Sequence, residues 1–185
     1  MSLLIKDANG NIVSTPGFDP AYGASCTAQA YVTAMTFAQL KGPTTGVARV
    51  KRVTVTMTVG AGQTAGDLKV QLVKQSTANT VATSVGTPTP LNSTSSAATS
   101  IFSTTSGSTL GTVTGTAIRS ARLGGAAAAG PTGTTSFTFD FSHNLDQAPV
   151  LNSASEYLGI EVLNGTTTPT GAVLDADIEW EEASA

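Results

Sequence analysis

Charge is scarce in this chain of 185 residues. Asp, Glu, Lys and Arg together make up 11% of it, whereas they make up about a quarter of typical soluble proteins. Nine basic residues against twelve acidic ones give a net charge of -3. Nucleic-acid binding depends on clustered Lys and Arg side chains that neutralise phosphates. We therefore expect no nucleic-acid partner.

Cysteine and long apolar runs are also scarce. The single cysteine, Cys26, has no second cysteine in the chain to pair with, so we expect a small buried residue there instead of a reactive thiol. No apolar stretch approaches the roughly 18 residues that a membrane span requires. The apolar run Leu3 to Ile5 is too short for the core of a signal peptide. We expect a protein that is made in a cytoplasm and does not contact a membrane.

Residues that carry chemistry form no recognisable catalytic or metal-binding motif. His143 is the only histidine, and no nucleophile motif such as G-x-S-x-G accompanies it. The segment from Asp175 to Glu179 lacks the glycine turn and twelve-residue loop of a calcium-binding EF-hand. The glycine-rich segment from Gly60 to Gly66 lacks the Gly-Lys-Ser/Thr ending of a phosphate loop. We predict no catalytic residue, no cofactor and no metal site.

An enzyme remains an alternative in one form, a glycan hydrolase. Such an enzyme uses a pair of carboxylates, and Glu156 with Glu161 or Asp140 is the best pair that the sequence offers. Aromatic residues, which usually form platforms for sugar rings, make up 5% of the chain. Trp180 is expected in the core, because it shares its strand phase with Ile178.

Alternation of apolar and polar residues is the strongest pattern in the chain. In the segment 47 to 59, Val53, Val55, Met57 and Val59 alternate with threonines, which predicts a half-buried strand. Val50 is out of phase with Val53, so we expect a β-bulge near Lys51 and Arg52. Further strands are predicted at 30–40, 68–73, 110–122, 137–141, 158–162 and 174–180. For 30–40 a helix is the alternative, because of its alanine content.

These segments predict an all-β fold of about eight strands, a two-sheet antiparallel sandwich with jelly-roll-like topology. We place the sandwich domain at residues 29–185, with one or two short edge strands inside the low-complexity segment 75–109. Residues 1–28 are predicted to form an extended N-terminal arm. Its apolar residues indicate that it docks on another surface: these are Leu3, Leu4, Ile5 and Phe18.

Two short strips of charge stand out on the predicted strands. The basic strip is Arg49, Lys51 and Arg52, and the acidic strip runs from Asp175 through Asp177 and Glu179. Alternate residues of a strand point to the same face of a sheet, so each strip presents its charges together. We expect these strips to act as protein contacts that pair across a subunit interface.

Several segments carry a resemblance to a known family. They are Arg49-Val-Lys-Arg-Val-Thr-Val55, Gly62-Gln-Thr-Ala-Gly-Asp-Leu-Lys-Val-Gln-Leu-Val-Lys74, Ser153-Ala-Ser-Glu-Tyr-Leu-Gly-Ile160 and Asp175-Ala-Asp-Ile-Glu-Trp180, together with the opening Leu4-Ile-Lys-Asp-Ala-Asn-Gly10. With these strand and turn patterns the chain resembles small jelly-roll virion structural proteins of tailed bacteriophages.

The resemblance implies a non-enzymatic role in the virion, assembled from subunits made in the cytoplasm of the bacterial host. Decoration or cementing of the capsid is the function we expect, through contacts with the major capsid protein or other virion proteins. Self-association as a homotrimer and anchoring through a terminal arm are common in such proteins. The alternative is a subunit of a fibre or tail appendage that binds a host surface receptor or glycan.

Overall fold

We describe the protein from a computed structural model. The residues it describes are 5–6, 12–13, 20–60, 63–64, 66–78, 82–86, 88–92, 95, 97–105, 110–125, 133–143 and 147–183. Their regular structure consists of strands. Within these ranges no helix has the length and apolar character to cross a membrane.

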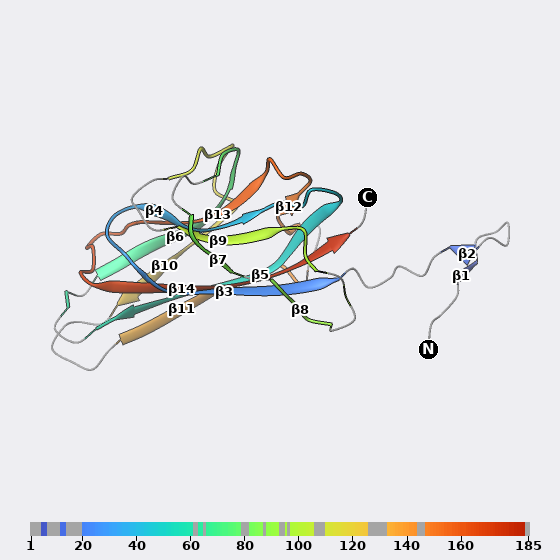
Figure 1. Cartoon of the computed structure of the whole chain (residues 1–185). Helices are drawn as coiled ribbons and strands as arrows, with labels where there is room; N and C mark the ends of the chain where they lie inside the picture. The colour runs from blue at the N-terminus through green and yellow to red at the C-terminus, as the bar shows by residue number, and fades with distance from the viewer. Residues whose placement is uncertain are drawn as a thin grey trace.

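The described residues form fourteen strands (Figure 1). They are β1 (Ile5–Lys6), β2 (Ile12–Val13), β3 (Ala21–Ala30), β4 (Met35–Lys41), β5 (Val47–Val59), β6 (Gly66–Gln75), β7 (Ala82–Gly86), β8 (Thr89–Pro90), β9 (Ile101–Thr105), β10 (Arg119–Gly125), β11 (Gly133–Asp140), β12 (Val150–Leu151), β13 (Tyr157–Asn164) and β14 (Ala172–Ala183). Eight of them have seven residues or more, and the six additional strands are shorter.

The eight longer strands form an antiparallel sandwich of two sheets, which confirms the predicted fold class. One sheet has the order β11-β5-β14-β3-β8, and the other has the order β10-β6-β13-β4-β9-β7. β3 pairs with β14, β4 with β13, β5 with β11 and β6 with β10. Among the eight longer strands in chain order, the first therefore pairs with the eighth, the second with the seventh, the third with the sixth and the fourth with the fifth. This nested pairing is the arrangement of a jelly roll.

The arm is shorter than predicted. β3 lies inside the sandwich and pairs with β14 from Ala21↔Glu181 onward, so the sandwich begins near residue 20 and not at residue 29. β1 and β2 form a separate two-stranded sheet with Ile5 opposite Val13. Leu3, Leu4 and Phe18 lie outside the described residues, so their expected docking stays a prediction.

Two other boundaries differ from the predicted ones. The segment after β6 contributes three short strands, β7, β8 and β9, where one or two were expected. Within the described residues 110–118, strand structure is limited to an isolated bridge between Gln75 and Val113, and β10 begins only at Arg119. Leu110 and Val113 are exposed, because the segment that carries them runs over β6 instead of entering the core.

The core lies between the two sheets. Val53, Val55 and Met57 are fully buried, as the alternation in this segment predicts. Trp180 is also fully buried, and its ring lies 5.8 Å from that of Tyr22 between centroids. Burying each such side chain contributes about 1.5–3 kcal/mol. The polar residues of the same strands face outward, so the outer faces of the sheets carry the candidate functional groups.

Candidate functional site

The two predicted charge strips lie side by side in one chain. β14 pairs with β5, which places Glu179 opposite Arg52 and Glu181 opposite Arg49. Arg52 forms an ion pair with Glu179. The Glu181 carboxylate forms two ion pairs, with Lys51 Nζ at 2.7 Å and with Arg49 Nη1 at 3.5 Å. All three basic residues therefore have acidic partners within the chain. The expected pairing of the strips across a subunit interface stays a prediction.

The β-bulge predicted near Lys51 and Arg52 brings these charges to one face. Arg52 pairs with Glu179, but the next residue of β14, Trp180, pairs with Val50. Lys51 is thus the extra residue of the bulge. Val50 and Val53 are both buried, whereas the chain between them turns two consecutive basic side chains outward. A regular strand would have pointed one of them into the core.

Next to the ion pairs lies a region of the same face that is rich in hydroxyl groups. Thr54 and Thr138 share a hydrogen bond of 2.9 Å across β5 and β11, and Thr58 and Thr134 share one of 3.3 Å. Thr56 lies between them on β5 and pairs with Ser136. The six hydroxyl side chains that these two strands place on this face form an uncharged surface. We call this surface, with the ion pairs and the acidic strip beside it, the polar face.

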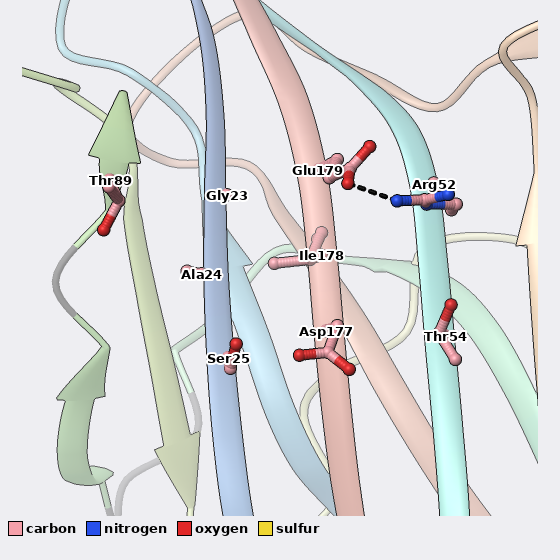
Figure 2. Close-up of a pocket in the computed structure, with 9 residues that line it drawn as sticks. All are labelled: Gly23, Ala24, Ser25, Arg52, Thr54, Thr89, Asp177, Ile178 and Glu179. Atoms are coloured by element: carbon pink, nitrogen blue, oxygen red, sulfur yellow. Dashed lines mark hydrogen bonds and ion pairs between the residues drawn. The ribbon is translucent and has the colours of Figure 1, made fainter. Parts of the chain in front are cut away.

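A shallow hollow of about 650 Å³ opens on the polar face. Figure 2 shows Ser25, Asp177 and Thr54 beside one another on three neighbouring strands, next to the ion pair of Glu179 and Arg52. The hollow is also lined by Gly23, Ala24, Ile178 and Thr89. The small residues of β3 leave room for the hollow. It offers one exposed carboxylate, Asp177, among hydroxyl groups, and one compensated ion pair.

The outer face of the other sheet holds a buried polar cluster that the sequence did not reveal. Glu161 is 1% exposed and accepts hydrogen bonds from Gln71 Nε2 at 2.7 Å and Gln75 Nε2 at 2.9 Å. Gln75 also donates to Thr36 Oγ1 at 3.0 Å. A Cβ atom at Gly159 would lie 2.5 Å from the Gln75 amide, so this cluster requires glycine there.

A second interaction missed from the sequence fixes the segment before β9 to the end of β14. The Glu182 carboxylate accepts hydrogen bonds from the Thr99 and Ser100 amides, each at 2.9 Å, and from Trp180 Nε1 at 3.1 Å. Burial alone would raise the pKa of Glu182, but these hydrogen bonds outweigh burial and hold the pKa below its ordinary value. Glu182 thus remains a carboxylate and acts as a structural anchor.

The carboxylates considered for glycan hydrolysis do not come together. Glu156 accepts a hydrogen bond from the Asn152 amide at 2.9 Å and lies 3.7 Å from Lys74 Nζ. Glu161 lies five positions further along the chain, about 16 Å away by strand rise. Asp140 belongs to the other sheet and accepts hydrogen bonds from Ser142, which lower its pKa. Among the described residues, no group of three or more His, Cys, Asp or Glu is placed to hold a metal ion.

Cys26 is buried against β14, as predicted. It is 4% exposed, and burial raises the pKa of its thiol to about 12. A thiol with such a pKa has almost no thiolate at neutral pH, and the thiolate is the reactive form. Cys26 is therefore part of the core and not a reactive site.

Comparisons of the chain with models of protein families, with curated proteins and with solved structures found no match.

Proposed function

We propose that this chain is a structural virion protein of a tailed bacteriophage that decorates the capsid and stabilises it through protein contacts. The observation that carries the proposal is the polar face. Its charges are largely compensated inside the chain, around an uncharged region of hydroxyl groups. The resemblance of the strand segments to small jelly-roll virion proteins supports the same role.

A face of this kind is suited to burial against another protein. Burying an unpaired charge is costly, and here Arg52 and Lys51 already have acidic partners. Threonine hydroxyls can donate and accept hydrogen bonds, so they can satisfy either kind of group on a partner. The major capsid protein, or another virion protein, is the partner we propose for this face.

Binding to purified heads and to expanded shells tests the proposal. We expect the wild-type protein to bind them and to raise the temperature at which they release their contents. Thr56→Glu, which places a second carboxylate beside Asp175 on the polar face, should weaken binding about tenfold or more. Thr112→Glu, on the segment that covers the other sheet, is the matched control and should bind normally.

The proposal fails if the wild-type protein binds neither heads nor shells and if its deletion leaves head stability unchanged. It also fails if both charge variants bind as well as the wild type, because the polar face would then not be the contact.

The hollow in Figure 2 favours a second candidate, a fibre or tail-appendage subunit that binds a host receptor or glycan. Asp177, Ser25 and Thr54 offer hydrogen-bonding groups of the kind that polyhydroxylated ligands need. Glycan-array binding that Asp177→Asn abolishes would support this candidate. Labelling of intact particles with antibodies separates the two functions. The label would lie at the tail for a fibre or tail-appendage subunit and at the head for a decoration protein.

A further inference from the structure

The two sheets end in four strands, and three of them carry features that prevent pairing with another chain. β7 has a register irregularity between Ala82 and Ser84. β8 has two residues and ends in Pro90. β10 carries two exposed arginines, Arg119 and Arg122. Bulges, prolines, short length and charge are the usual means by which sheet edges avoid aggregation.

The fourth edge strand, β11, has none of these features. Its register with β5 is unbroken over all eight residues, from Gly133↔Val59 to Asp140↔Arg52. The strand contains no proline, and its only charge is on its last residue, Asp140. In the part of the chain that the structure describes, no strand pairs with the outer edge of β11. This edge is therefore a regular, nearly uncharged template for another strand.

Side chains beside this edge are also incompletely covered. Phe137 is 41% exposed and packs edge-on against Phe139, with 4.9 Å between ring centroids. A small hollow of about 180 Å³ lies there, bounded on one side by Arg119. The arginine stands over the ring of Phe141, 5.8 Å from its centroid. An apolar side chain from a partner strand would cover the exposed part of Phe137.

We propose that a second copy of this chain pairs with β11, strand to strand and antiparallel, so that the two sheets become one. Residues that pair across strands must point to the same face. Antiparallel pairing of β11 with itself therefore places its even-numbered hydroxyl residues opposite one another, and Phe137 and Phe139 opposite residues of the core-facing row.

The hydroxyl row of β11 is complementary to itself, because a hydroxyl group can donate and accept hydrogen bonds, and charge does not oppose a second copy as the occupant. The chain has a net charge of -3, yet the residues from Gly133 to Phe139 bring no like charges together when β11 meets itself. The contact is twofold and closes at two copies. The trimer that the family resemblance implies would require a different surface. This inference does not depend on the proposed capsid partner.

Native mass spectrometry and analytical ultracentrifugation of the full chain test the pairing. We expect a dimer for the wild type. Ser136→Lys brings like charges together at the edge, which is unfavourable in paired strands, and should raise the dimer dissociation constant about tenfold or more. Thr112→Lys adds the same charge on the other side of the sandwich and should leave the dimer unchanged.

Hydrogen exchange of the wild-type protein gives a second readout that does not depend on a variant. In the dimer all amides of β11 should be protected, whereas a free edge leaves alternate amides exposed to exchange. A wild-type monomer overturns the proposal. So does an oligomer whose mass is insensitive to Ser136→Lys, or rapid exchange of every second β11 amide.

Discussion

Replacing Glu182 with glutamine should destabilise the sandwich by about 2 kcal/mol at neutral pH. The carboxylate accepts four hydrogen bonds, from the amide and hydroxyl of Thr99, the amide of Ser100 and the indole of Trp180. The two hydrogen bonds from Thr99 to one carboxylate oxygen are exposed, so each contributes about 1 kcal/mol. Glutamine keeps one acceptor oxygen but sets an NH₂ group against the remaining donors, so about half of the interaction is lost.

The cost of this substitution should depend on pH. The pKa of Glu182 is lower in the folded chain than its ordinary value of 4.5, so the unfolded chain binds a proton more readily. Stability from the carboxylate is therefore complete above that ordinary value and is lost as the pH falls through the folded pKa. The difference between wild type and Glu182→Gln should be largest near pH 7 and should shrink toward pH 3.

Urea unfolding at one protein concentration measures both effects. Trp180 is the only tryptophan and is fully buried, so its fluorescence reports unfolding of the sandwich. Asp177→Asn on the same strand is the control, because Asp177 is exposed, and it should change stability by less than about 0.5 kcal/mol. A Glu182→Gln effect that is below 0.5 kcal/mol, or that is equal at pH 7 and pH 3, would refute this reasoning.

Three further predictions concern the core and the strands. Cys26 should resist alkylation at pH 8 until the protein unfolds, because it is buried and its pKa is about 12; labelling followed by mass spectrometry checks this, and rapid labelling of the native state would contradict it. Gly159→Ala should cost about 2–4 kcal/mol in urea unfolding, since the new methyl group displaces Gln75 from its buried cluster; a loss below 1 kcal/mol would contradict it. Deleting Lys51 should leave a cooperatively unfolding protein, because it removes the bulge and keeps the apolar phase, whereas deleting Thr56 should prevent folding by reversing the faces of part of β5; circular dichroism and thermal melting distinguish the two outcomes.

The strands that could be predicted are those whose two faces differ strongly. β5 and β14 alternate large apolar residues with polar ones, so their core residues follow from the period alone. The predicted bounds of β5 also match, whereas β14 extends beyond the predicted 174–180 at both ends. The break in phase at Val50 also predicted the bulge. β3 reads Ala-Tyr-Gly-Ala-Ser-Cys-Thr-Ala-Gln-Ala, and apart from Tyr22 and Gln29 its side chains are small. Such a strand has little contrast between faces, which is why it was assigned to the arm.

The missed site features depend on which strands become neighbours. The charge strips pair within the chain because the last strand lies beside the third longer one, and no local pattern gives that order. The burial of Glu161 depends in the same way on Gln71 and Gln75 of the adjacent strand β6. Sequence reasoning identified the charged groups of the polar face, but their partners follow only from the tertiary pairing.

The pairing of β3 with β14 also determines how the molecule responds to force. Ala21 lies opposite Glu181, and the Glu182 amide donates to the Pro20 carbonyl. The start of β3 and the end of β14 therefore lie side by side. Tension between these two ends would peel β3 from β14 one hydrogen bond at a time. Tension between the arm and a partner on the polar face would instead load the β3–β14 hydrogen bonds together in shear. An arm held by a neighbour would therefore be mechanically strong in one direction and easily opened in the other.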